Sequence, residues 1–170
     1  MMKQLYAERI LMMKTRKHWW IWIPVILYIG FIYSNSLTAA SVSSVISETV
    51  AAELASFLKH FGLTVGNIEL FHYYVRKMAH FTEFSGLGFL VSIAICICPL
   101  FKRRSLNFIL FLMLVPFSDE MLQRLVPGRT GQFSDMMIDC SGILVGGLLG
   151  YFIFLAVKDC YNALQKKSVQ

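Results

Sequence analysis

Four long apolar runs, separated by polar segments, dominate the pattern of hydrophobic and polar residues along this chain. They cover residues 19–36, 79–99, 106–123 and 136–157. A helix needs about 20 apolar residues to cross the hydrocarbon core of a bilayer, with a range of about 17–25. Each run is therefore predicted to form a membrane-spanning helix, the third only if polar residues 118–123 continue it.

The segment between the first two runs is amphipathic. In residues 37–58, apolar side chains recur at steps of mostly three or four, with serines and a glutamate between them. This spacing predicts a helix rather than a strand, lying along the outer membrane surface or covering the bundle. Gly62 and the pair Gly66 and Asn67 indicate its end and a turn. A second short amphipathic stretch, residues 68–78, leads into the second span.

Composition supports a membrane location. Hydrophobic residues make up 56% of the 170 residues, charged residues only 15%, and the mean hydropathy is +0.60. Soluble domains contain about 45–50% apolar residues, so this is predicted to be an integral membrane protein. The length predicts one domain.

Lysine and arginine residues indicate the orientation. They precede the first run, lie between the second and third at Lys102, Arg103 and Arg104, and follow the fourth. By the positive-inside rule, both termini are predicted to be cytoplasmic. The net charge of +6 then favours contact with anionic lipid over nucleic acid.

The first run has two interpretations. A basic start, an apolar run and small residues after it also describe a cleaved signal peptide. Trp19, Trp20 and Trp22 are instead typical of an interfacial aromatic anchor, so we expect an uncleaved span.

The predicted architecture is an all-α, multi-pass four-helix membrane bundle with an additional extracytoplasmic amphipathic helix between the first and second spans. We expect a cytoplasmic basic tail over residues 1–18, a membrane domain over 19–157 with 37–78 outside, and a cytoplasmic tail over 158–170.

Ionisable residues at the edges of the apolar runs carry the candidate chemistry, because charge in or near hydrocarbon is costly and usually functional. His80 and Glu83 are three residues apart and share a helix face. The imidazole can exchange a proton near neutral pH, and the carboxylate can fix its tautomer. The alternative is a polar clasp between helices.

A second group follows the third run. Glu120 is predicted to face inward, oriented by Gln123 three residues later, while Asp119 points elsewhere on the helix. Arg129 follows a turn that returns it over these acids, and its guanidinium suits a carboxylate or phosphate. The alternative is an internal salt bridge from Arg129 to Glu120 or Asp135.

The fourth run begins with two acids. Asp135 can be a residue of the first helical turn, favoured by the helix dipole, whereas Asp139 lies deeper. Gly142, Gly146 and Gly150 then form a small-residue stripe. Such stripes allow close helix packing, which would bring Asp139 into the bundle interior.

No metal site or cofactor is expected from the sequence. The four cysteines, Cys96, Cys98, Cys140 and Cys160, lack the paired spacing of a zinc site or of a disulfide framework. They are predicted to be buried thiols.

Taken together, the block of residues 76–84 (RKMAHFTEF) and the block from Asp119 through Gln123 and Arg129 to Gly142 resemble the VanZ-like family of bacterial membrane proteins. The resemblance covers about residues 20–157. The sequence departs from the family pattern at Met121, where histidine is common, and at Asp139, where asparagine is frequent. The first departure removes a candidate metal ligand.

The resemblance implies a cell-envelope protein that gives low-level resistance to teicoplanin, a lipoglycopeptide acting on peptidoglycan precursors outside the membrane. Our first hypothesis is binding or remodelling of an envelope lipid or peptidoglycan precursor. The candidate binding residues are Arg76, Lys77, Gln123, Arg129, Asp135 and Asp139.

The second hypothesis is a hydrolase or transferase acting on a lipid-linked substrate. Its candidate catalytic residues are His80, Glu83, Asp119 and Glu120. Proton-coupled transport is weaker, because the acids gather at one face. A scaffold locked by its polar residues is the remaining alternative.

Overall fold

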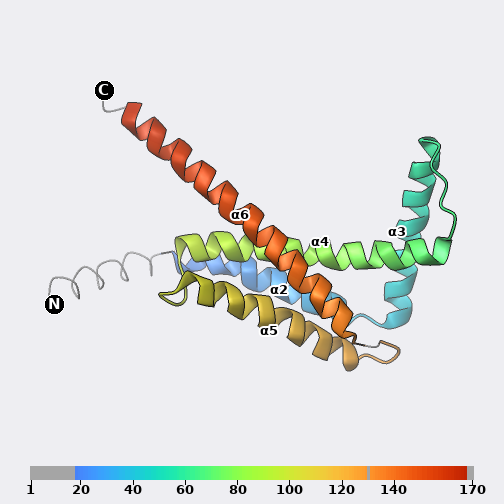
Figure 1. The fold of residues 1–170 in the computed structure, drawn as a ribbon. Helices are drawn as coiled ribbons and strands as arrows, with labels where there is room; N and C mark the ends of the chain where they lie inside the picture. Colours follow the sequence, from blue (N-terminus) through green and yellow to red (C-terminus); the bar gives the residue numbers. More distant parts are fainter. Residues whose placement is uncertain (1–17, 130, 168–170) are drawn as a thin grey trace.

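The computed structural model describes residues 18–129 and 131–167, and these are almost entirely helical (Figure 1). The predicted tail residues 1–17 lie outside this range. The elements are the short 3₁₀ helix η1 (Trp19–Trp22) and the helices α2 (Ile23–Ser36), α3 (Ala40–His60), α4 (Ile68–Ile97), α5 (Arg104–Arg124) and α6 (Phe133–Lys167).

The prediction of an all-α membrane bundle is confirmed. Within the described residues, α4, α5 and α6 are each long and apolar enough to cross a membrane. A fourth crossing is possible where η1 and α2 are followed, after a bend of 102°, by α3. Figure 1 shows α3 standing across the end of the other helices.

The bounds of three helices can be compared with the expected spans, and α4 and α6 extend well beyond theirs. The stretch 68–78 and the second span form one helix, α4, because the segment contains no glycine or proline. Asn67 caps it by accepting a hydrogen bond from the Leu70 N–H at 3.0 Å. The polar residues 118–123 do continue α5. α6 runs through the expected tail to Lys167, again with no helix-breaking residue.

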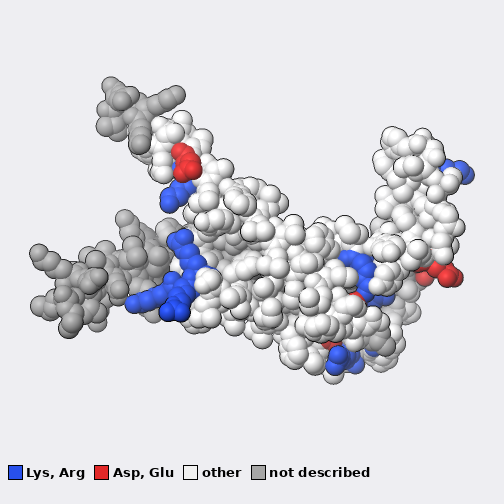
Figure 2. Space-filling model, in the orientation of Figure 1, with Lys and Arg blue, Asp and Glu red and all other residues white. Residues whose placement is uncertain are grey.

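The helices alternate in direction, which separates two ends of the bundle (Figure 1). α2 and α5 run one way, and α4 and α6 return. We call the end with the α4–α5 turn at Lys102, Arg103 and Arg104 the basic end; Lys and Arg side chains gather there in Figure 2. We call the opposite end, where α2 and α5 finish and α6 begins, the site end.

α6 makes its most extensive contact with α4, and the glycine stripe explains why. A Cβ on Gly142 would lie 2.5 Å from the Phe81 carbonyl oxygen, and one on Gly146 would overlap the Ser85 carbonyl. The predicted close packing is therefore present. Around it lie the buried side chains of the core: Val25, Ile32, Phe84, Leu87, Val91, Val115 and Ile143.

The three tryptophans divide between surface and core. Trp19 and Trp20 are exposed, as an interfacial anchor requires, but Trp22 is only 8% exposed. Its Nε1 donates a hydrogen bond to the Cys98 carbonyl at 2.9 Å, and its ring stacks on Phe111. Trp22 therefore joins η1 to the end of α4 and to α5, so its side chain packs inside the bundle instead of facing outward as the sequence predicted.

None of the four cysteines forms a disulfide bond among the described residues. Cys98 and Cys140 are buried as expected, and Cys96 is partly buried. Cys160 is exposed on α6, so the prediction of a buried thiol is wrong there.

Candidate functional site

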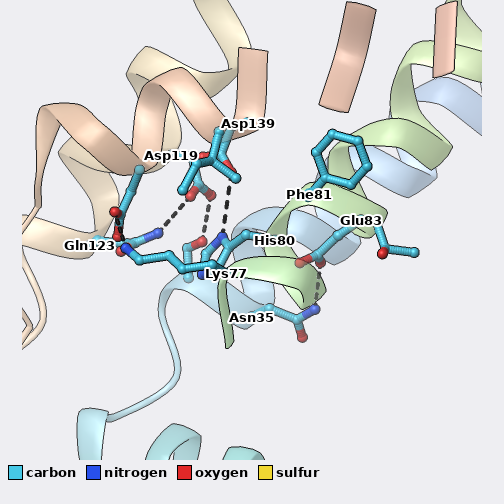
Figure 3. Close-up of polar contacts among 12 residues, drawn as sticks. Asn35, Lys77, His80, Phe81, Glu83, Asp119, Gln123 and Asp139 are labelled. Carbon is cyan, nitrogen blue, oxygen red and sulfur yellow. Dashed lines mark hydrogen bonds and ion pairs between the residues drawn. The ribbon is translucent and has the colours of Figure 1, made fainter. Parts of the chain in front are cut away.

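Most polar side chains that the sequence singled out meet at the site end, where α4, α5 and α6 enclose them (Figure 3). His80 comes from α4, Asp119 from α5 and Asp139 from α6, and both aspartates are 0% exposed. We call these three residues the buried triad. Their ligand-type atoms all lie within 4.8 Å of one another, so they form one cluster.

His80 faces Asp139 rather than Glu83. The His80 Nδ1 atom lies 3.6 Å from Asp139 Oδ1. Glu83, the expected partner, instead accepts a hydrogen bond from Asn35 Nδ2 at 2.7 Å. The close contact of α6 with α4 brings Asp139 opposite the imidazole, which a spacing rule within one helix does not anticipate.

Asp119 is held by two hydrogen bonds. The Ser36 hydroxyl donates to Oδ1, and Gln123 Nε2 donates to Oδ2 at 2.7 Å. We expected Gln123 to orient Glu120. It donates to Asp119 instead, because residues three and four apart are both neighbours on a helix and the spacing does not choose between them.

Glu120 is also buried, at 4% exposed, but on a different side of α5. Its Oε2 would lie 2.7 Å from a Cβ on Gly131. Neither carboxylate oxygen has a hydrogen bond of normal geometry within the described chain. Glu120 is therefore buried as predicted, but the acid of α5 that joins His80 and Asp139 is Asp119, contrary to the choice of Glu120 over Asp119 made from the sequence.

A cleft opens next to the triad, between α2, α3, α4 and the α5–α6 loop. We call it the polar cleft; its volume is about 220 Å³. Its walls carry hydroxyl, amide and charged groups, and His80 belongs both to the cleft and to the triad. The lining residues are Asn35, Ser36, Thr38, Ser43, Ile46, Ser47, Arg76, Ala79, His80, Glu83 and Arg129.

Two guanidinium groups, those of Arg76 and Arg129, face this cleft. Arg129 Nη1 donates to the Ser36 carbonyl at 2.9 Å, while its buried Nε has no partner among the described residues. Burial lowers the pKa of Arg129, and the nearby charge of Arg76 lowers it further, against the opposing effect of Asp119. Arginine nevertheless stays charged at neutral pH.

The predicted alternative of a salt bridge from Arg129 to Glu120 or Asp135 is not found among the described residues. Asp135 pairs with Lys77. The Lys77 ammonium also lies over the Tyr73 ring, 5.1 Å from its centroid. Lys77 and Asp135 therefore satisfy each other beside the cleft instead of lining it.

An apolar groove adjoins the polar cleft on the surface of the bundle. Its volume is about 500 Å³, and it shares Asn35, Ala79 and Glu83 with the cleft. We call it the apolar groove. The remaining lining residues are Tyr28, Phe31, Val50, Val75, Met78 and Thr82. The polar cleft and the apolar groove therefore meet at the three residues that they share.

The side chains that α2 and α3 contribute to the site were not predicted from the sequence. Ser36 positions both Asp119 and Arg129, and Asn35 anchors Glu83. Ser43 and Ser47 line the cleft from α3. The available signal was the run of small polar residues directly after the first apolar run.

Comparison with known proteins gave one finding. The model of the VanZ/LLP1 family matches residues 12–157, which is most of the chain. Comparisons with curated proteins and with solved structures gave no significant match.

Proposed function

Because the chain belongs to the VanZ-like family of membrane proteins, we propose that its polar cleft binds the anionic head group of an envelope lipid or lipid-linked peptidoglycan precursor. Occupancy of this site limits the access of lipoglycopeptides such as teicoplanin to their target. One observation carries the proposal: Arg76 and Arg129 face one cleft, and neither forms an ion pair within the described residues.

The chemistry of the cleft suits a phosphate or diphosphate. Guanidinium groups bind phosphate oxygens through paired, charge-assisted hydrogen bonds. The hydroxyl groups of Thr38, Ser43 and Ser47 supply further polar contacts for phosphate or sugar. The buried Nε of Arg129 has no partner among the described residues and is a further donor for a ligand that reaches it.

The apolar groove favours a lipid over a free phosphate. It continues from the cleft along α2 and α4 and is lined mainly by apolar side chains. An acyl or polyprenyl chain can lie there while its head group occupies the cleft. The charge pattern supports the same location, because the basic end is expected on the cytoplasmic side and the residues that line the cleft lie at the opposite end of α2 and α4.

A second candidate is a hydrolase or transferase of a lipid-linked substrate, favoured by the double role of His80. Its ring reaches the cleft, while its Nδ1 faces the buried carboxylate of Asp139. Such a pairing can orient an imidazole as a general base. Release of phosphate or a new lipid product from a bound precursor would separate catalysis from binding.

Filling the cleft tests the proposal without removing a charge. Ser47 lines the cleft from α3, whereas Ser41 on the same helix is exposed outside it. We expect Ser47→Phe to abolish protection against teicoplanin, because the phenyl ring occupies head-group space. Ser41→Phe is expected to protect as well as the wild type. The measurement is growth inhibition of a susceptible Gram-positive host at matched membrane levels, with vancomycin as comparator.

Equal protection by wild type and Ser47→Phe would contradict the proposed use of the cleft. Absence of protection by the wild type would contradict the teicoplanin phenotype itself.

A further inference from the structure

Asp139 is a buried carboxylate whose charge the surrounding protein does not balance through hydrogen bonds. Its side chain is 0% exposed, and neither Oδ1 nor Oδ2 accepts a hydrogen bond from the residues the structure describes. Removing a carboxylate from water without compensating contacts costs several kcal/mol. Both oxygen atoms are therefore available to a ligand inside the cluster.

The distance to His80 points to the kind of ligand. The 3.6 Å between His80 Nδ1 and Asp139 Oδ1 is too long for a hydrogen bond. Two tetrahedral ligands that each lie about 2.0–2.2 Å from one zinc ion are about 3.3–3.6 Å apart. The pair thus has the spacing of two ligands on one cation.

Asp119 is the third residue of the proposed ligand set, and hydrogen bonds from neighbouring side chains orient its carboxylate. Its donor oxygen lies within 4.8 Å of the other two ligand atoms. Ser36 and Gln123 each donate to one of its oxygens, and each carboxylate oxygen keeps a second lone pair. Hydrogen bonds of this type commonly hold metal-binding carboxylates in place.

The buried carboxylates also lack a direct partner with a permanent positive charge, since the nearest cationic group is the imidazole of His80 beside Asp139. Asp119, Glu120 and Asp139 are all at most 4% exposed. Among the described residues, no lysine or arginine forms an ion pair with any of them. A bound dication would offset two of these three negative charges.

We propose that His80, Asp119 and Asp139 bind a divalent transition-metal cation, with zinc as the first candidate. One imidazole and two carboxylates suit zinc, and three protein ligands leave an open coordination position. The three ligands come from three helices far apart in sequence, which explains why cysteine spacing and Met121 gave no sign of them. The proposal is independent of lipid binding in the cleft.

Metal binding to purified full-length protein tests this directly. The protein is prepared in detergent without a histidine tag, stripped with a chelator and titrated with zinc against a chromophoric competitor. We expect about one zinc per chain, because the described residues contain one such cluster of ligands. His80→Gln and Asp139→Asn should each weaken zinc affinity by more than the roughly 10–100-fold loss typical of outer-shell substitutions.

Asp159→Asn is the matched control, because it makes the same chemical change on the same helix at an exposed position, about five turns from Asp139. Asp159 forms no ion pair among the described residues, so this variant should keep wild-type zinc affinity. Thermal melting gives a second readout, since a cation bound only to the folded state stabilises it. Zinc should raise the melting temperature of the wild type and of Asp159→Asn but not of His80→Gln.

Size-exclusion elution checks folding, and if Asp139→Asn does not fold, His80→Gln alone carries the test. Parallel titrations use Mn²⁺ and Mg²⁺. If the wild type binds Mn²⁺ more tightly than zinc and the triad variants lose this binding, the cation site is supported with manganese as its metal. The proposal is overturned if neither zinc nor Mn²⁺ binds the wild type, or if both triad variants bind as tightly as the wild type.

Discussion

Replacing Gly146 by alanine is expected to lower the melting temperature of the protein clearly, whereas the same replacement at Gly30 should leave it almost unchanged. A Cβ on Gly146 would overlap the Ser85 carbonyl of α4, and a helix backbone cannot yield as a flexible side chain can. Gly30 has no atom within 4 Å of the corresponding position. The two variants therefore make the same chemical change in opposite packing environments.

The expected cost at Gly146 is large because α6 would have to move away from α4. Overpacking a well-packed core costs about 1–3 kcal/mol and occasionally more, while total stability is commonly about 5–15 kcal/mol. Moving α6 also withdraws Asp139 from His80. At Gly30, alanine should be neutral or slightly stabilising, because it lowers the entropy of the unfolded chain.

Thermal melting and detergent size-exclusion chromatography of the two purified variants measure this difference. Equal melting temperatures for Gly146→Ala and Gly30→Ala would mean that the direct contact between α4 and α6 is not present in the membrane.

Replacing Arg129 by glutamine is expected to abolish protection against teicoplanin while leaving folded protein in the membrane. The guanidinium lines the polar cleft with a free Nε, so its charge is available to a ligand. Loss of a charge-assisted hydrogen bond costs about 1.5–3 kcal/mol, which is roughly a 10–150-fold loss of affinity. Glutamine keeps a donor that can reach toward Ser36, so the α2 contact is only partly lost.

Lys59→Gln is the control for net charge. Lys59 lies in the last turn of α3, outside the polar cleft, and loses the same unit of charge when substituted. We expect it to protect like the wild type in growth-inhibition assays at matched expression. If Arg129→Gln still protects fully, the cleft arginine is not part of the protective site; if Lys59→Gln also loses protection, the effect is one of net charge.

The fold follows from patterns within single segments. Apolar runs long enough to span a bilayer predicted the helices, and the four-residue repeat of Gly142, Gly146 and Gly150 predicted the close contact made by α6. Helix bounds were less predictable. The boundary expected at residue 79 does not exist, because a change from amphipathic to apolar character does not interrupt a helix.

The candidate site was predictable only in part. Sequence spacing correctly put ionisable residues near one end of the bundle, but it assigned His80 to Glu83 and Gln123 to Glu120. The observed partner of His80 depends on how α4 and α6 cross. That relation is set by side-chain packing between distant segments, and no spacing within one helix encodes it.

Binding of a lipid-linked phosphate by the polar cleft and the apolar groove together is tested most directly by calorimetric titration of the purified full-length protein with farnesyl diphosphate. The comparison ligands are farnesol, which lacks the head group, and inorganic diphosphate, which lacks the tail. We expect farnesyl diphosphate to bind most tightly and Arg129→Gln to weaken its binding by roughly 10–150-fold. Equal binding of farnesol and farnesyl diphosphate, or unchanged affinity in Arg129→Gln, would contradict it.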